Sequence, residues 1–252
     1  SYWQMLMSGV NKLSCQDRCN AGNYIQRPMQ EECLQIDIFA TEHNMRIVNP
    51  VMIKDISGRI LNNEPVGITG NDKYKNLLKV TEERWNGQIK YTDNSNNEYE
   101  SGVQIITGKD DKIVFKRTLK LVPQELAVGI GCKKGKSAHE IERAVKKTFD
   151  KAGLLLEAIA VVASVDRKAD EAGIIEFARK CKVPYKTYTP EYLRDVEGDF
   201  VSSAFVEEQI GVGNVCERSA GAASSGGEKL VGKTADNGVT VAIYRVAQKN
   251  KE

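Results

Sequence analysis

The fold of this chain is decided by one stretch, which runs Leu126-Ala127-Val128-Gly129-Ile130-Gly131-Cys132-Lys133-Lys134-Gly135-Lys136-Ser137. Its first five residues form a short apolar run that ends in a glycine-rich turn, which is typical of a strand buried on both faces. Ser137 and Glu140 have the spacing of a capping box, and an apolar stripe then continues to a stop at Gly153. The stretch therefore predicts a strand, a tight loop and an amphipathic helix.

The residues that follow repeat this alternation of strands and helices. Strands are predicted at 158–165 and 185–188, a helix capped by Asp170 ends before Pro184, and a short helix opens at Thr189-Pro190. Such an alternation implies parallel pairing. Further helical stretches are predicted at 203–210 and 215–223, and a terminal hairpin at 229–232 and 239–246. We expect an α/β fold, with a three-layer C-terminal domain that has a mostly parallel sheet and a terminal β-hairpin.

The first half of the chain has weaker patterns. Helices are predicted at 34–43 and 54–61, a short strand at 65–69 and a polar loop at 92–98. Two β-rich runs, 102–107 and 112–122, flank Gly108-Lys109-Asp110-Asp111 and predict a hairpin. The predicted division is an N-terminal segment over 1–50, a small central linker region over 51–123 and the main domain over 124–248.

Composition excludes several classes of protein. The net charge of +2 over 252 residues does not indicate nucleic acid as a partner. Because no apolar run reaches about 18 residues, and the opening Ser1-Tyr2-Trp3-Gln4 lacks a basic start, we expect a soluble, cytoplasmic protein without membrane contact. The six cysteines are scattered and are interpreted as reduced thiols. Cys15 and Cys19 have no second pair at ligand spacing, so no metal site is expected.

The loop after the first strand of the main domain favours an anionic ligand. Glycines let a backbone approach a ligand, the helix N-terminus offers free amides, and the lysines supply charge. The predicted binding residues are Gly129, Gly131, Cys132, Lys133, Lys134, Gly135, Lys136 and Ser137. A phosphate loop would need glycine at position 130, which is Ile130, so nucleotide binding is only a minor alternative. Carboxylates suit the loop as well as phosphates. The alternative to a binding site is a tight turn between the strand and the helix, with solvated lysines.

Few titratable residues accompany this loop. His139, in the first turn of the helix, and Asp166, just past the second strand, are the candidates for a catalytic base. Lysines beside Cys132 could lower the pKa of its thiol, although a buried cysteine is the commoner outcome. No nucleophile, base and orienting acid occur together, so a triad is not supported. A second glycine- and serine-rich segment, 219–227, is interpreted as a helix end and turn, or alternatively as a backbone cradle opposite the lysines.

Three separated segments carry a resemblance to a known family. They are 129–141, 163–173 and 238–243, and together they resemble the C-terminal domain of the CbiG family of cobalamin biosynthesis, which is related to the CobE proteins. The resemblance implies hydrolysis of the δ-lactone of cobalt-precorrin-5A in the anaerobic pathway, with release of acetaldehyde to give cobalt-precorrin-5B. It also implies a cobalt-corrinoid intermediate as the partner, with other cobalamin-pathway enzymes as further partners. Cobalt enters within that substrate, so no cofactor is expected.

The match weakens toward the N-terminus. Residues 37–44 and 56–61 look like the end of the family's N-terminal domain, whereas its glycine-rich GHxGGAN-type motif is only echoed by Ser8-Gly9-Val10-Asn11-Lys12. Residues 1–50 are therefore interpreted as a remnant of that domain. Two hypotheses follow: a cobalt-precorrin-5A hydrolase, or a non-catalytic corrinoid-binding module, such as an inactive fragment of the hydrolase.

Overall fold

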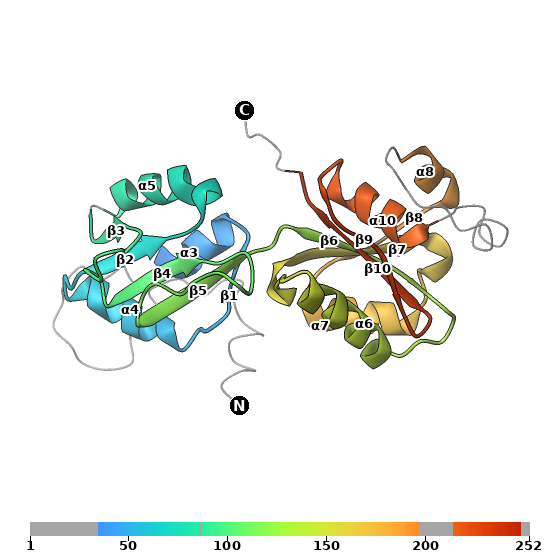
Figure 1. The fold of residues 1–252 in the computed structure, drawn as a ribbon, viewed down its shortest axis with the longest axis horizontal. Coiled ribbons are helices and arrows are strands. Elements are labelled where there is room, and N and C mark those ends of the chain that lie inside the picture. The colour runs from blue at the N-terminus through green and yellow to red at the C-terminus, as the bar shows by residue number, and fades with distance from the viewer. Residues whose placement is uncertain (1–34, 86, 197–213, 248–252) are drawn as a thin grey trace, which may run out of the picture.

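The structure is a computed structural model that describes residues 35–85, 87–196 and 214–247. It contains two five-stranded sheets, one built from residues 45–123 and one from residues 126–245. Figure 1 shows the two α/β units side by side, joined where the first sheet ends and the second begins. The expectation of a mixed α/β fold is confirmed.

The first sheet has the order β1-β5-β4-β2-β3. Its strands are β1 (Met45–Ile47), β2 (Val66–Thr69), β3 (Ile89–Tyr91), β4 (Ser101–Ile105) and β5 (Arg117–Pro123). Strands β2 to β5 run parallel, and β1 is antiparallel to β5. The accompanying helices are α3 (Gln35–Glu42), α4 (Met52–Leu61), the 3₁₀ helix η1 (Asp72–Tyr74) and α5 (Lys75–Arg84). Asn44, at φ 51°, ends the first predicted helix in the left-handed conformation.

The predicted hairpin at Gly108–Asp111 is wrong. Strands β4 and β5 pair in parallel, with Ser101 opposite Arg117, so residues 106–116 cross back along the sheet. Within this crossover the buried ring of Phe115 covers two strand glycines, because a Cβ atom would lie 2.6 Å from the ring at Gly67 and 2.4 Å at Gly102. Contacts between a ring and glycines that are distant in sequence leave no periodic pattern of residues. The local turn residues were therefore the only signal in this region, and they predicted the wrong connection.

The predicted linker region over 51–123 also needs correction. A boundary after residue 50 would separate β1 from its partner β5 and from the core that both share with Ile56, Ile68 and Leu119. Residues 35–123 thus form one α/β unit with its own hydrophobic core. Residues 1–34, with most of the predicted remnant and the Cys15–Cys19 pair, lie outside the described residues.

The second sheet has the order β8-β7-β6-β10-β9. Its strands are β6 (Leu126–Cys132), β7 (Ile159–Val165), β8 (Tyr185–Tyr188), β9 (Lys229–Asp236) and β10 (Val239–Arg245). Strands β6, β7 and β8 run parallel, whereas the hairpin β9–β10 joins β6 antiparallel. This is the predicted combination of a parallel sheet and a terminal hairpin.

Helices cover both faces of this sheet, as the three-layer prediction required. They are α6 (Ala138–Lys151), α7 (Ala172–Cys181), α8 (Pro190–Asp195) and α10 (Val215–Ser224), with the 3₁₀ helices η2 (Leu156–Ala158) and η3 (Asp166–Lys168). Val128 and Ile130 pack with α6 and α7 on one face, and Ala127 packs with α10 on the other. Helix α7 begins after Glu171 rather than at the predicted cap Asp170. The predicted helix at 203–210 lies outside the described residues.

The direction of the strands places the ends of the two sheets. Strand β5 ends at Pro123 and β6 starts at Leu126, so the carboxyl ends of β2, β4 and β5 meet at the junction of the units. Strand β6 starts at that junction and runs away from it for seven residues, about 20 Å. The lysine-rich loop therefore lies at the far end of the second unit. Within the described ranges, no helix is long and apolar enough to cross a membrane.

Candidate functional site

The loop between β6 and α6 contains the predicted capping box. Ser137 Oγ accepts a hydrogen bond from the Glu140 amide at 3.3 Å, and a Glu140 carboxylate oxygen accepts from the Ser137 amide at 3.1 Å. Lys136 Nζ donates to the other oxygen of Glu140 at 2.8 Å. Lys136, followed by the Ser137 amide, lowers the pKa of Glu140 to about 2. Glu140 therefore occupies part of the anion position at this helix N-terminus.

A second carboxylate of the chain occupies the loop itself. Glu171, at the start of α7, accepts a hydrogen bond from the Gly135 amide at 2.7 Å and another from Lys168 Nζ at 2.8 Å. These contacts, with the hydrogen bond from Lys168 as the larger effect, lower the pKa of Glu171. Gly135 is in the left-handed conformation, at φ 80°, which directs its amide at Glu171 without steric cost. The loop is thus built to hold carboxylates, two of which are internal.

Two lysines and several amides of the loop remain for a ligand. Lys133 and Lys134 are exposed and form no ion pair within the described part of the chain. Four backbone amides likewise donate no hydrogen bond to any described residue, namely those of Lys134, Lys136, Ala138 and His139. The Lys133 amide donates to Gly238 O at 2.9 Å, which fastens the loop to the β9–β10 turn. A carboxylate bound here would meet two cations and the start of α6.

The glycines of β6 serve packing. A Cβ atom on Gly129 would lie 1.8 Å from Cys216 O of α10, and one on Gly131 would lie 2.6 Å from Thr240 Oγ1. Cys132 is half-buried, and burial raises the pKa of its thiol although Lys168 opposes this effect. The alternative of a lysine-activated thiol at Cys132 is therefore wrong.

Both candidate bases lie at the carboxyl edge of the second sheet. His139 is exposed in the first turn of α6, and Asp166 is exposed as the first residue of η3 after β7. Neither side chain forms a hydrogen bond or ion pair with the described residues. Without a partner that orients it, neither is arranged as a catalytic base in this structure.

The glycine- and serine-rich segment packs against the middle of β6 at Ala220 and ends near the start of that strand at Gly227. Gly227 is packed against Arg245 O, where a Cβ atom would be 1.7 Å away, and Arg245 pairs with Leu126 at the start of β6. A cavity of about 510 Å³ lies there, bounded by Tyr192, Gly227, Tyr244 and their neighbours. The interpretation of this segment as a cradle opposite the lysines is therefore wrong, since its glycine pair Gly226-Gly227 lies a strand length away from them.

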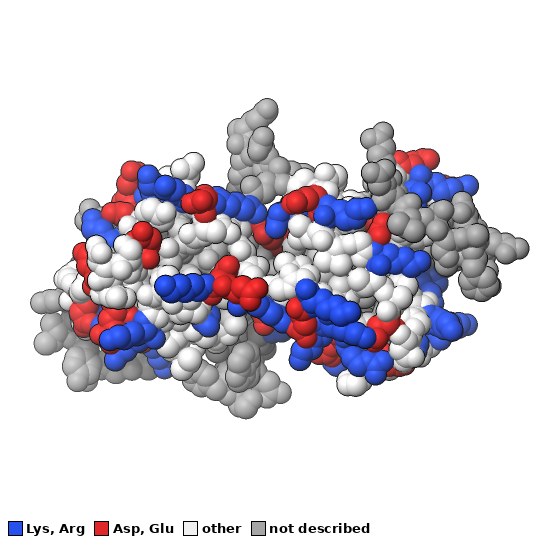
Figure 2. Space-filling view, in the orientation of Figure 1, with Lys and Arg blue, Asp and Glu red and all other residues white. Residues whose placement is uncertain are grey.

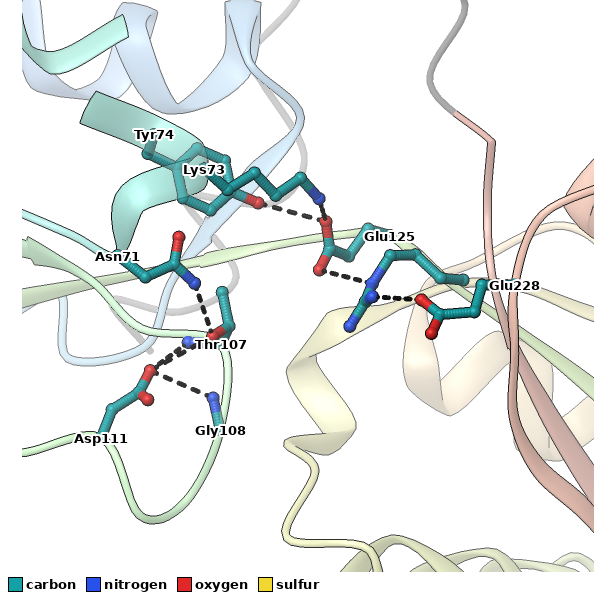
Figure 3. Close-up of polar contacts among 9 residues, drawn as sticks. Asn71, Lys73, Tyr74, Thr107, Gly108, Asp111, Glu125 and Glu228 are labelled. Carbon is teal, nitrogen blue, oxygen red and sulfur yellow. Dashed lines mark hydrogen bonds and ion pairs between the residues drawn. The ribbon is translucent and has the colours of Figure 1, made fainter. Parts of the chain in front are cut away.

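A polar cluster that sequence patterns missed lies at the junction of the two units (Figure 3). Glu125 accepts a hydrogen bond from Tyr74 Oη at 3.1 Å and pairs with Lys73, while its other oxygen lies 3.6 Å from Arg245 Nε. Arg245 also pairs with Glu228 at 2.6 Å. These residues come from η1, the connector between the sheets and the end of the β9–β10 hairpin, so no local motif could reveal them.

A second set of contacts orders the loops of the first unit at this junction and joins them to the second unit. Figure 3 shows Asn71 Nδ2 donating to Thr107 Oγ1 at 3.1 Å, and Asp111 accepting from the amides of Thr107 and Gly108. Gly108 forms a β-bridge with Leu154, next to an ion pair between Lys109 and Asp150. The bridge and this ion pair thus join the two units in addition to the contacts of Glu125.

The described residues were compared with the requirements of a metal site, and the face drawn in Figure 2 with those of a large charged patch. No group of three or more His, Cys, Asp or Glu residues that could hold a metal occurs in the described ranges. Figure 2 shows basic and acidic side chains interspersed over the face in view.

The sequence of the second unit matches a known family model. The model is described as "Cobalamin synthesis G C-terminus" and matches residues 126–244, from the first residue of β6 almost to the end of β10. Residues 126–244 are thus similar to the CbiG C-terminal family. The matched segment contains the lysine loop, and the junction residue Glu125 directly precedes it.

Curated relatives and a solved structure are similar to parts of the chain. The chain is 36% identical over 125 residues to a cobalt-precorrin-5A hydrolase of Salmonella typhimurium, a match that covers 49% of the chain and 35% of that protein. It is 28% identical over 88 residues to a cobalt-precorrin-5A hydrolase of Priestia megaterium, with 35% and 24% covered. The chain thus spans about a third or less of these relatives. The crystal structure of CobE, a protein from the cobalamin (vitamin B12) biosynthetic pathway, is 29% identical with a TM-score of 0.47, covering 51% of the chain and 94% of CobE.

Proposed function

We propose that this chain takes part in cobalt-precorrin-5A hydrolysis, opening the δ-lactone and releasing the two-carbon fragment as acetaldehyde to give cobalt-precorrin-5B. The observation that carries the proposal is the match of residues 126–244 to the CbiG C-terminal family, together with relatives that are named for this hydrolysis. The substrate class follows from the same names, and cobalt is carried inside the substrate.

The lysine loop supports a role for the matched segment in holding that substrate. A corrinoid intermediate carries acetate and propionate carboxylates on its rim, and this loop already binds two internal carboxylates, Glu140 and Glu171. Lys133 and Lys134 extend the same chemistry to solvent. The loop therefore offers the charge and the amides that a substrate carboxylate needs.

The direct test measures acetaldehyde. The chain is incubated with cobalt-precorrin-5A, and acetaldehyde is trapped and quantified while the absorbance of the corrinoid is followed. We expect one acetaldehyde for each corrinoid consumed, because opening of the lactone precedes loss of the fragment. Corrinoid binding without acetaldehyde would reject the hydrolase for this chain and leave the second candidate, a corrinoid-binding module. That candidate is favoured by one observation, namely that His139 and Asp166 have no orienting partner among the described residues.

The two exposed lysines can be tested by binding alone. In a variant with both Lys133→Gln and Lys134→Gln, we expect the Kd for cobalt-precorrin-5A to rise about tenfold, because two exposed charge-assisted contacts are lost. Absorbance titration gives the Kd, and raising the salt concentration should reduce the difference. The matched control is a variant with Lys146→Gln and Lys147→Gln, two lysines of α6 outside the loop. An equal loss in both variants would show that only overall charge matters.

A further inference from the structure

The junction of the two units has the topology of a ligand site. In the first sheet, β2 lies between β3 and β4. The chain goes from β2 to β3 on one side and then crosses to β4 on the other side. The carboxyl ends of β2 and β4 therefore flank a topological switch point. Ligands of open α/β sheets bind outside the carboxyl ends of strands at such a point. Asn71 follows β2 and Thr107 follows β4, and their side chains meet there.

A pocket opens beside this point, between the units. It has a volume of about 150 Å³ and is lined by His43, Asn44, Tyr74, Pro123, Gln124, Glu125, Val246 and Ala247. Since a water molecule takes about 30 Å³, the pocket has room for a six-membered ring with one water, but not for a macrocycle. A large substrate could insert only an edge, and the rest would lie outside.

The polar groups of this pocket are held in a fixed arrangement. Glu125 receives Lys73 and the Tyr74 hydroxyl from the first unit, and it faces Arg245 of the second. Burial and the nearby Glu125 raise the pKa of Tyr74 well above its ordinary value, so the phenol stays protonated and its hydroxyl keeps donating a hydrogen bond to Glu125. The Lys73 ammonium has three N–H donors and pairs with one oxygen of Glu125. Donors therefore remain for an oxygen of a ligand.

We propose that this junction pocket, lined by His43 and bordered by Lys73, receives the lactone edge of the substrate and is where the ring is opened. In this proposal, which rests on the hydrolase function above, His43 is the proton acceptor and Lys73 stabilises the oxyanion. Glu125 and Tyr74 are positioning residues, because they fix the Lys73 ammonium at the pocket.

The step balances without any further reactant. Water attacks the lactone carbonyl carbon while the His43 imidazole takes one of its protons, and the carbonyl oxygen becomes an oxyanion beside the Lys73 ammonium. The oxyanion then reforms the carbonyl, the ring carbon–oxygen bond breaks, and the leaving oxygen takes the proton from the His43 imidazolium. The products are a carboxylic acid and an alcohol, and the alcohol carries the two-carbon fragment.

The competing explanation is that these contacts only hold the two units together, since interfaces within a chain are commonly polar. The residue Lys109 separates the two explanations. Its ion pair with Asp150 bridges the same junction, and neither residue lines the pocket. A purely mechanical junction should suffer equally from loss of either ion pair.

The test compares variants of the full chain in the acetaldehyde assay. We expect His43→Gln to lower kcat about 100-fold or more and Lys73→Met to lower it by a similar factor, with the Kd for cobalt-precorrin-5A changed less than about threefold. For Lys73→Arg, which keeps the cation, we expect kcat to recover in part. Glu125→Gln should lower kcat. It should also lower the midpoint of thermal unfolding by less than a substitution in the hydrophobic core does.

The control variant is Lys109→Met, for which we expect the activity of the unmodified chain. If Lys109→Met loses as much activity as Lys73→Met, or if His43→Gln keeps full activity, the junction site is overturned while the hydrolase proposal stands. If the unmodified chain binds cobalt-precorrin-5A but releases no acetaldehyde, the hydrolase proposal fails first and the junction site fails with it.

Discussion

Replacing Gly129 by alanine is expected to destabilise the second unit by about 3–4 kcal/mol, which is large for a single methyl group. The added Cβ atom would lie 1.8 Å from Cys216 O and 2.8 Å from Ala220 N, which are both backbone atoms of α10. A side chain can rotate away from such a contact, but a helix backbone can escape only if the whole helix moves. Helix α10 covers one face of the sheet, where its Ala220 packs with Ala127 of β6 and Ala163 of β7. Displacement of α10 therefore opens that entire layer.

Thermal and urea unfolding check this result. We expect a fall in Tm of about 10 °C, with the transition of the second unit affected and that of the first retained. The matched control is Gly58→Ala in α4, where a Cβ atom meets nothing within 4 Å. That substitution should be neutral or stabilising by up to about 1 kcal/mol, since alanine is the better helix former. A similar loss in both variants would show that glycine flexibility, rather than close approach of α10, explains Gly129.

Replacing Gly173 by alanine is expected to disturb the lysine loop directly. The new Cβ atom would lie 2.0 Å from Lys136 O and 3.0 Å from the Ile141 side chain, so α7 and the loop must separate. Glu171 precedes α7 and would move with it, which would break its hydrogen bond to the Gly135 amide. We expect a loss of about 2–3 kcal/mol in stability and a Kd for cobalt-precorrin-5A raised by tenfold or more.

The decisive comparison is between the loss of stability and the rise in Kd for cobalt-precorrin-5A in each variant. Gly226→Ala is the control, because Gly226 also has a strained conformation for alanine, at φ 80°, but it lies at the other end of β6 in open space. It should cost about 1–2 kcal/mol and leave binding unchanged. If binding by the folded Gly173→Ala variant equals that of the unmodified chain, the loop is not where the corrinoid is held.

Sequence patterns predicted the second unit well because its signals are local. The strand at Leu126, the capping box of Ser137 and Glu140, the stop at Gly153 and the turn at Asn237-Gly238 each depend on residues within one turn or one strand. The physical reason is that backbone hydrogen bonding and the hydrophobic period act over a few residues. For the same reason the family resemblance was visible in three short segments.

The first unit was predicted less well because its decisive contacts join distant residues. Strand β4 pairs in parallel with β5 across a crossover, and Phe115 fills the space above Gly67 and Gly102. Neither fact leaves a period or a turn motif in the sequence. A charged turn between two apolar runs looks the same whether the strands return antiparallel or cross over.

The lysine loop and the junction pocket show the same division. The sequence by itself determined that a glycine-rich, lysine-rich loop precedes a capped helix, since the cap and the charges are adjacent residues. Only the tertiary structure decided that Glu171 occupies the Gly135 amide, that Gly129 makes room for α10, and that His43 meets Tyr74 and Glu125 in one pocket. Those contacts depend on how helices and sheets pack, and packing brings together side chains that are far apart along the chain.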